Sequence, residues 1–398
     1  MPDTLIGDRI SITVSRLTDH GTPPSASASR LPRGRPGAAP RTATSGVRDA
    51  LSRGGLALVK RVEHQVAMRS EQCPVGATRV TVVFLQWDRV AGPPAFAALD
   101  ARLRGLGVPA RRLIVDNAAD NSFAITRADG VTVISGDNTT REFSGWQQGI
   151  TYARAGGEPT DVWLLVNDRF ATSPYSFLDR LGTGAIRAAH SLQAVVGRLD
   201  YYPCPVTSFG MTFSSWVNTA FYLVPDGVLQ RVGSPVLVDR SNLDDVLPPR
   251  YPAGSALFCP DGPVGDLHGR YIASFLAHLS DAPHSIHWYR RLDLGEETWP
   301  EFRGKVMSIL NEQLFSARSR VAGAPLLELE LADRLGRLGA DTPAVRDAAT
   351  RVVLDPAKEL MRLTTLVGRA RLALAVLASG RSKRWRRRGW ASAPLEDL

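Results

Sequence analysis

The chain contains few cysteines, few lysines and no long apolar run, and each shortage disfavours a class of protein. Its 398 residues include 3 cysteines, which lie far apart and form no C-x-x-C pair. This usage argues against a disulfide scaffold and against a cysteine-ligated zinc site. No uninterrupted apolar segment reaches the ~20 residues of a transmembrane helix. The N-terminal segment lacks the apolar core of a signal peptide, so we expect a cytoplasmic protein.

Several catalytic signatures are missing as well. The chain has no phosphate-loop Gly-Lys-Ser/Thr, no G-x-S-x-G and no H-E-x-x-H. These absences disfavour P-loop nucleotide hydrolysis, serine hydrolase chemistry of the nucleophile-elbow type and zincin-type proteolysis.

The positive charge of the chain comes from arginine. The formal net charge is +9, and lysine occurs only at Lys60, Lys305, Lys358 and Lys383. Part of the excess is local, because residues 381–390 read RSKRWRRRGW. A basic balance favours either plain solubility or binding to anionic lipid, acidic glycan or nucleic acid. Nothing else in the chain predicts a specific nucleic-acid partner.

Composition divides the chain into three parts. Residues 1–75 form an extension that we expect to be largely disordered or partly helical, since residues 18–47 are rich in Pro, Ser, Ala, Gly and Arg without apolar periodicity. Residues 76–335 carry the periodic apolar pattern of a folded domain. Residues 336–398 read as a helical, basic C-terminal extension.

Strands and helices alternate through the folded domain. Apolar runs predict strands in 79–87, 113–115, 130–138 and 161–170, with helices at 94–106 and 141–157. Further along, we expect a helix at 176–189, strands at 194–197 and 219–224, a helix at 305–322, and a strand or helix start at 324–331. Such alternation indicates an α/β fold with a mostly parallel sheet flanked by helices.

Polar residues follow three of the predicted strands. Asp116, Asn138 and Asp168 each lie where a strand leaves the sheet, and ligands of open α/β sheets bind at this edge. An Asp after a strand is also a common helix cap or turn former. Taken together in this order, the residues predict a site for a nucleotide diphosphate with a divalent cation, Mg²⁺ or Mn²⁺.

The segments TVVFLQW, LIVDNAADNS, GDNTTREFSGWQQGI and DVWLLVNDRF carry a family resemblance. Their order resembles the nucleotide-binding half of glycosyltransferases with the GT-A fold, is similar to the family-two transferases, and among these is nearest to the rhamnan-synthesis type. The resemblance implies a donor and nucleotide site and places the family's D-x-D metal motif on 166–168, with Asp168 as the metal ligand. The implied donor-site residues are Asp116, Asn117, Asn138, Arg141, Glu142, Trp146, Asn167 and Arg169.

The metal motif departs from the family pattern. This chain reads Asn167-Asp168-Arg169 and so has a single carboxylate. An arginine in that place is itself able to neutralise phosphate charge. In the family a late histidine completes the metal shell, and His287 is the best match, although such a histidine is more often structural.

A second match lies at 311–329, NEQLFSARSRVAGAPLLEL. It resembles the family's E-D-x-D-L-S-x-R-x-x-x-x-G segment, in which one carboxylate deprotonates the acceptor hydroxyl. Glu312 would then be the general base, which needs reach to that hydroxyl and a suitable pKa. The alternatives are a solvated helix residue at this position, or another base among Asp244, Asp245 and Asp266.

Trp216 and Asn218 lie between the two matches, where the family places its acceptor-side strand. They are candidates to stack on and hydrogen-bond an acceptor sugar, or else belong to the core. In the tail, residues 356–390 combine a leucine-lined helical stripe with Trp385 and Trp390 among basic residues. This segment suits either an anionic membrane interface or a helix packed on the domain with a disordered basic end.

Taken together, the sequence predicts a glycosyltransferase. We expect it to move a hexose or deoxyhexose from a nucleotide diphosphate sugar to a glycan or lipid-linked acceptor, with inversion, in cell-surface polysaccharide synthesis. The predicted location is the cytoplasm, with the tail as a candidate contact to the inner face of the plasma membrane. The alternative is a non-catalytic nucleotide-sugar or glycan-binding module of the same fold.

Overall fold

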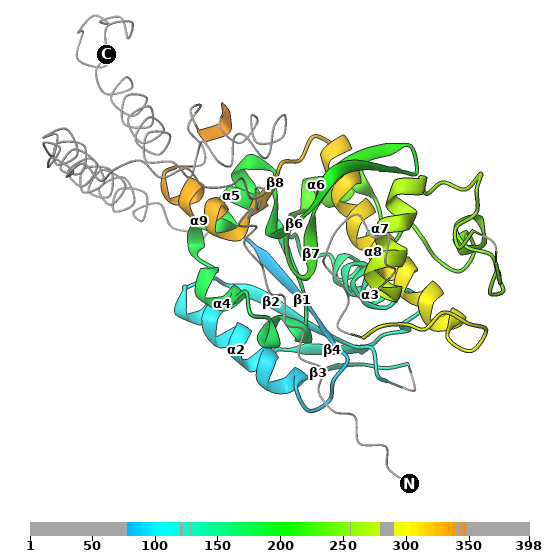
Figure 1. Ribbon diagram of the computed structural model, residues 1–398. Helices are drawn as coiled ribbons and strands as arrows, with labels where there is room; N and C mark the ends of the chain where they lie inside the picture. Colours follow the sequence, from blue (N-terminus) through cyan, green and yellow to red (C-terminus); the bar gives the residue numbers. More distant parts are fainter. Residues whose placement is uncertain are drawn as a thin grey trace, which may run out of the picture.

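The computed structural model describes residues 78–119, 122–127, 129–254, 256–278, 290–339, 343 and 345–347. The predicted extension at 1–75, most of the extension at 336–398 with its 356–390 segment, and His287 lie outside these described residues. Figure 1 shows the described part as a twisted sheet with helices packed on both faces.

A single mixed sheet of eight strands forms the centre of the described part (Figure 1). The strands stand in the order β3-β4-β2-β1-β5-β7-β6-β8. In chain order they are β1 Val80–Gln86, β2 Ala110–Asp116, β3 Ala124–Thr126, β4 Thr132–Ser135, β5 Val162–Asn167, β6 Val195–Ser208, β7 Met211–Pro225 and β8 Leu326–Glu328. The α/β fold and the mostly parallel sheet predicted from the sequence are therefore confirmed.

The sheet combines a parallel block with an antiparallel one. Strands β4, β2, β1 and β5 pair in parallel, while β3 runs antiparallel at one edge. On the other side, β7 pairs antiparallel with both β5 and β6, and β8 runs parallel to β6. The parallel block brings the carboxyl ends of its strands to one edge of the sheet.

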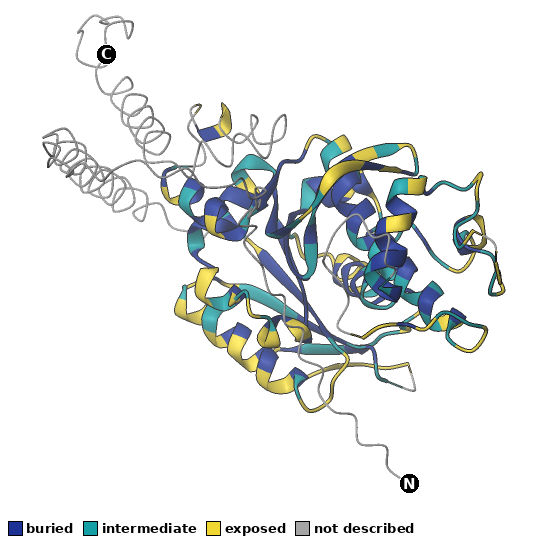
Figure 2. Cartoon of the chain, in the orientation of Figure 1, coloured by how far each residue is buried: buried dark blue, intermediate teal, exposed yellow. Residues whose placement is uncertain are grey.

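Helices cover both faces, because the central strands are apolar on both sides. In β1, Val80, Val82 and Phe84 face one core cluster, whereas Val83 and Leu85 face the other. The first face is covered by α2 Gly92–Gly105, α4 Phe177–Arg180, α5 Thr183–Leu192 and α9 Leu329–Arg337. The second is covered by α3 Glu142–Ala155, α6 Asp226–Val232 and α8 Trp299–Val321. Figure 2 shows the sheet and the inner sides of these helices as the buried layer.

A third cluster extends the second face. The β6–β7 hairpin is much longer than the two short strands that the sequence predicts, and its register shifts between Tyr201 and Val206. Its far end packs with α7 Asp266–Ala277 and α8, close to the short turns of η3 Leu243–Asp245. Trp299 and Phe302, stacked at 5.0 Å between ring centroids, anchor the start of α8 in this cluster.

The predicted helix at 176–189 is two helices in the structure, α4 and α5, because Leu181 is extended between them. Gly184 of α5 allows a close crossing with α9: a Cβ there would lie 2.1 Å from the Asp333 carbonyl oxygen. The 324–331 segment, predicted as a strand or a helix start, forms β8 followed directly by α9. Among the described residues, no helix is both long and apolar enough to cross a membrane.

Candidate functional site

The carboxyl edge of the parallel block gathers the predicted polar residues. Gln86 of β1 lies in register with Asp116 of β2, and Leu85 lies in register with Asn167 of β5. Asp116 and the Asn167-Asp168-Arg169 turn therefore flank the end of β1, as the parallel topology predicts. Asp168 and Arg169 belong to η2 Asp168–Thr172, a short turn that carries the chain out of the sheet.

Asp168 faces inward, onto the turn after β1. Its Oδ2 accepts hydrogen bonds from the backbone N–H groups of Trp87 and Asp88, both at 2.7 Å, and the residue is 6% exposed. Burial raises the pKa of this carboxyl, against the lowering effect of the two N–H groups. Asp168 thus fixes the turn between β1 and α2.

Both the oxygen and the nitrogen of the Asn167 side-chain amide form hydrogen bonds within the protein. Its Oδ1 accepts from the Arg169 N–H at 3.2 Å, and its Nδ2 donates to the Thr219 carbonyl at 3.4 Å. The first bond caps the η2 turn in the manner of a helix N-cap. Arg169, in contrast, is exposed at the sheet edge.

These residues do not fit a divalent-cation site. Mg²⁺ and Mn²⁺ require free carboxylate or carbonyl oxygens, yet the Asn167 oxygen caps a turn and one Asp168 oxygen already accepts from two backbone N–H groups. The next side chain is the cation Arg169. Across the described part of the chain, no cluster of His, Cys, Asp and Glu is arranged to hold a metal ion.

Asn117 ties the end of β2 to the turn before α3. Its Nδ2 donates to Asn138 Oδ1 at 3.3 Å and to the Arg141 carbonyl at 3.1 Å. Asn138 and Arg141 have positive φ angles of 50° and 56°, so this turn is held in a conformation that side chains rarely adopt. Asp116 closes its own turn by accepting from the Ala118 N–H at 3.0 Å. The turn presents Arg141 toward α8.

Trp146 of α3 lies in the core. It is 1% exposed, its Nε1 donates to the Val166 carbonyl at 3.4 Å, and its ring packs edge-on against Phe143 and Tyr222. A side chain without exposed surface has no face for a nucleotide or a sugar. The placement of Trp146 therefore does not support the predicted donor contact, and the apolar spacing of α3 accounts for it instead.

Glu312 of α8 reaches the same edge through Thr219. Its Oε1 accepts from the Thr219 N–H at 2.6 Å, while the Thr219 carbonyl accepts from Asn167. One residue of β7 thus joins the carboxyl end of β5 to the predicted base. Burial raises the pKa of Glu312 to about 8; the Thr219 N–H opposes this, and the charges of Asp200 and Glu142 add to it.

The rest of the second matched segment holds α8 in place. Asn311 is fully buried and clamps a loop: its Oδ1 accepts from the Leu237 and Val238 N–H groups at 2.7 and 2.9 Å. Ser316 accepts from the Val217 N–H at 3.0 Å, one turn of α8 after Glu312. These contacts fix the rotation of the helix, so Glu312 is presented at a defined position.

A buried polar chain behind Glu312 adds to this constraint. Ser208 Oγ and His268 Nδ1 are 2.5 Å apart, and His268 Nε2 and Gln313 Oε1 are 2.6 Å apart. Gln313 in turn donates to the Tyr202 hydroxyl at 2.8 Å. Burial lowers the pKa of His268 to about 4, so the ring is neutral at physiological pH. Gln313 is therefore fixed from both sides, and Glu312 next to it shares the constraint.

Three cationic side chains lie near one another where α8 meets this edge, and we call Arg141, Arg169 and Lys305 the cationic cluster. Lys305 precedes Glu312 by about two helical turns and shares its face of α8. Arg141 Nε donates to the carbonyl of Gly304, next to Lys305, at 3.3 Å. Burial, followed by the charges of Arg141 and Arg169, lowers the pKa of Lys305 to about 8, while the charges of Glu142 and Glu301 act in the opposite direction.

Trp216 and Asn218, the predicted acceptor-side residues, lie in a second polar group on β7. Asn218 donates through Nδ2 to Asp200 Oδ2 at 3.0 Å, and its Oδ1 accepts from the Ala220 N–H at 3.1 Å. Trp216 is partly exposed, with its ring 4.5 Å from that of Tyr202. Trp216 thus keeps a surface for a ligand, whereas the Asn218 amide is engaged within the protein.

Sequence reasoning missed Trp87, Lys305 and Asp200. Trp87 is 52% exposed on the turn that Asp168 fixes, at the end of β1. Lys305 is the only lysine between residues 76 and 335 of an arginine-rich chain, a signal that was present in the sequence. Asp200 lies beyond the short strand predicted at 194–197, and only the long β6–β7 hairpin places it opposite Trp216.

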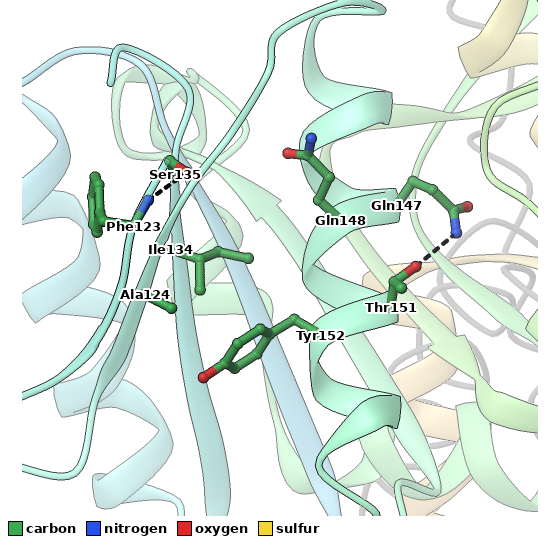
Figure 3. A pocket seen from close by; sticks show the side chains of 8 residues that line it. All are labelled: Phe123, Ala124, Ile134, Ser135, Gln147, Gln148, Thr151 and Tyr152. Carbon is green, nitrogen blue, oxygen red and sulfur yellow. Dashed lines mark hydrogen bonds between the residues drawn. The ribbon is translucent and has the colours of Figure 1, made fainter. Parts of the chain in front are cut away.

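A pocket of about 370 Å³ lies away from these residues, between the β3–β4 edge and α3 (Figure 3). Its walls are Phe123, Ala124, Ile134, Ser135, Gln147, Gln148, Thr151 and Tyr152. In Figure 3, Ile134 and Tyr152 face the space between strand and helix. None of the predicted site residues lines it.

Comparison of the chain with protein-family models, with curated proteins and with solved structures found no match.

Proposed function

We propose that the domain is a GT-A-type glycosyltransferase that moves a sugar from a nucleotide diphosphate sugar to a hydroxyl acceptor. The sheet supports this choice, since the parallel block β4-β2-β1-β5 has helices on both faces and a carboxyl edge at which ligands of open α/β sheets bind. The observation that carries the proposal is the joint contact of Asn167 and Glu312 with Thr219. It brings the donor-side strand end and the candidate base together.

The proposed reaction is an inverting displacement. The acceptor oxygen forms a bond to the anomeric carbon, while the bond from that carbon to the diphosphate oxygen breaks and its electron pair leaves with the diphosphate. Glu312, in its ionised form, takes the proton of the acceptor hydroxyl. A carboxylate with a pKa of about 8 is a stronger base than an ordinary one, at the cost of being mostly protonated at neutral pH.

The surrounding residues have separate roles in this proposal. Arg169 and Lys305 bind the diphosphate as charge accumulates on the leaving group: Arg169 is exposed where the chain leaves β5, and its charge acts on Lys305 of α8. The exposed Trp87 offers a face for the base or the sugar of the donor. On the acceptor side, the partly exposed Trp216 supplies a stacking surface on β7, the strand that also carries the Thr219 contact of Glu312.

The acceptor class and the location remain proposals from the sequence. We propose a glycan or lipid-linked glycan acceptor in cell-surface polysaccharide synthesis, with the enzyme acting in the cytoplasm. Contact with an anionic membrane through residues 356–390 belongs to the same proposal, and that segment lies outside the described residues.

A donor screen tests the activity. The purified protein is incubated with UDP-, GDP-, dTDP- and CMP-activated sugars, with and without Mg²⁺ or Mn²⁺, and nucleotide release is measured by chromatography. We expect slow hydrolysis of one donor by the wild type and its loss in Glu312→Gln, with Glu330→Gln as the matched control on the exposed start of α9. Binding of a donor without any hydrolysis or transfer would favour the non-catalytic module. No response to any donor from the folded protein would refute the proposal.

A further inference from the structure

The residues around the proposed diphosphate site have the wrong chemistry for the metal that the family resemblance implies. Asp168 is turned onto the backbone of the β1–α2 turn, and Asn167 caps η2. A divalent cation in this place would also meet repulsion from Arg169. The charge of a leaving diphosphate must therefore be stabilised by other groups.

The cationic cluster supplies such groups. Arg169 follows the end of β5, Arg141 precedes α3, and Lys305 lies on α8, so three separate elements contribute one cation each. Among the described residues, the Arg169 guanidinium makes no hydrogen bond or ion pair, and the only hydrogen bond of the Arg141 side chain goes to Gly304. Guanidinium groups bind phosphate oxygens through directed, charge-assisted hydrogen bonds.

We propose that this chain binds the diphosphate of its donor through Arg141, Arg169 and Lys305, and that transfer requires no divalent cation. This inference rests on the proposed function. It assigns Asp168 to positioning the turn that carries Trp87 and assigns the stabilisation of the leaving group to the cationic cluster. As the bond to the anomeric carbon breaks, the growing negative charge on the diphosphate meets fixed positive charge.

A single hydrogen bond holds Arg141 against α8, next to Lys305. Arg141 is held by the carbonyl of Gly304, and a Cβ at Gly304 would lie 3.2 Å from the Arg141 guanidinium. A glycine at this position therefore lets the guanidinium lie directly on α8. The pKa of Lys305, lowered to about 8, follows first from burial and then from the charges of Arg141 and Arg169. The negative charge of a bound diphosphate would raise the pKa of Lys305 again, so the protein should take up a proton when it binds the diphosphate at about pH 8.

Binding of free nucleoside diphosphates tests the inference. Isothermal titration calorimetry with UDP, GDP and dTDP is carried out in excess EDTA and again in excess Mg²⁺ or Mn²⁺. We expect one nucleotide to bind with the same affinity under all conditions. Arg169→Gln and Lys305→Gln should each weaken binding by about ten- to a hundredfold, the range for loss of one charge-assisted contact.

Arg127→Gln is the matched control. It removes one positive charge from an exposed ion pair with Asp129, at the amino-terminal edge of the sheet, and should leave the affinity unchanged. Arg169 is exposed, so its variant should fold, and thermal unfolding verifies this for each protein. Binding that appears only with Mg²⁺ or Mn²⁺ would overturn the inference and leave the proposed function intact. Failure of every nucleotide to bind the folded wild type, with or without metal, would overturn both.

Discussion

Replacing Glu312 by Gln should change how the stability of the protein depends on pH. In the folded state the Glu312 carboxyl lies against the Thr219 N–H, and burial raises its pKa to about 8 from the model-compound value of 4.5. A carboxyl whose folded pKa is raised contributes its stability below the unfolded value. That contribution is lost as the pH rises through the folded value. Gln keeps an oxygen for the Thr219 N–H and never ionises.

The size of the effect follows from the two pKa values. Between them, the free energy of unfolding of the wild type should fall relative to Glu312→Gln by about 1.4 kcal/mol per pH unit. From about pH 5 to about pH 8 the difference accumulates to roughly 3.5 kcal/mol, because the slope flattens near each end of the interval. Above the folded pKa the difference becomes constant.

Urea unfolding of both proteins at several pH values measures this difference. Titrating groups far from Glu312 are common to the two proteins and cancel, while any change in Asp200 and Glu142, whose charges act on Glu312, belongs to the measured difference. Glu330→Gln, whose side chain is 59% exposed, controls for removal of a carboxylate as such. A difference between wild type and Glu312→Gln that stays flat from about pH 5 to about pH 8 would show that the pKa of Glu312 is not raised, and would refute its role as a partly buried base.

Other predictions concern the same edge of the sheet. The rate of transfer should rise with pH as Glu312 loses its proton and fall as Lys305 loses its own, with a maximum near pH 8. In Lys305→Arg the fall in rate at alkaline pH should disappear. A transfer rate that does not change with pH would contradict both roles. Asp168→Ala should lower the free energy of unfolding by about 2–4 kcal/mol even in EDTA, because the N–H groups of Trp87 and Asp88 lose their acceptor. Unchanged urea unfolding would refute the positioning role of Asp168. Asn311→Ala should lower the free energy of unfolding by about 3 kcal/mol in the same assay, since the Asn311 amide also donates to the Val238 carbonyl at 2.7 Å. A loss under about 1 kcal/mol would show that Asn311 holds the loop only weakly.

The parallel block was predictable because its pattern is local. Continuous apolar runs such as Val162–Val166 identify buried strands, and the polar residues after them mark strand ends. The edge that gathers Asp116 and Asn167 follows from parallel topology alone. The same local logic located α3 within two residues at each end and the end of α8 within one residue, but α8 begins at Trp299, six residues before the predicted start.

The β6–β7 hairpin was harder to predict, for a physical reason. Residues 198–208 include Pro203 and Pro205, and proline within a run argues against a strand, so the local pattern suggests a loop. Pairing with Met211–Pro225 makes this segment a strand, and that pairing is a tertiary effect. The position of Asp200 opposite Trp216 could not be predicted for the same reason.

Residue roles at the site depended on which way side chains point. Sequence spacing placed Asp168 at the strand end correctly but did not show that its carboxylate turns onto the Trp87 and Asp88 N–H groups. Trp146 fits a family motif, yet its position in α3 is a core position. Glu312 was chosen by resemblance, while its contact with Thr219 depends on the packing of α8 along β7.

A crystal structure with a bound nucleotide tests the central claim most directly. The wild-type protein is crystallised in EDTA with the nucleoside diphosphate that binds most tightly. The account predicts the diphosphate against Arg169 and Lys305, with its terminal phosphate directed toward Glu312. A nucleotide bound elsewhere, for example in the pocket between β3–β4 and α3 (Figure 3), with the cationic cluster empty, would contradict it.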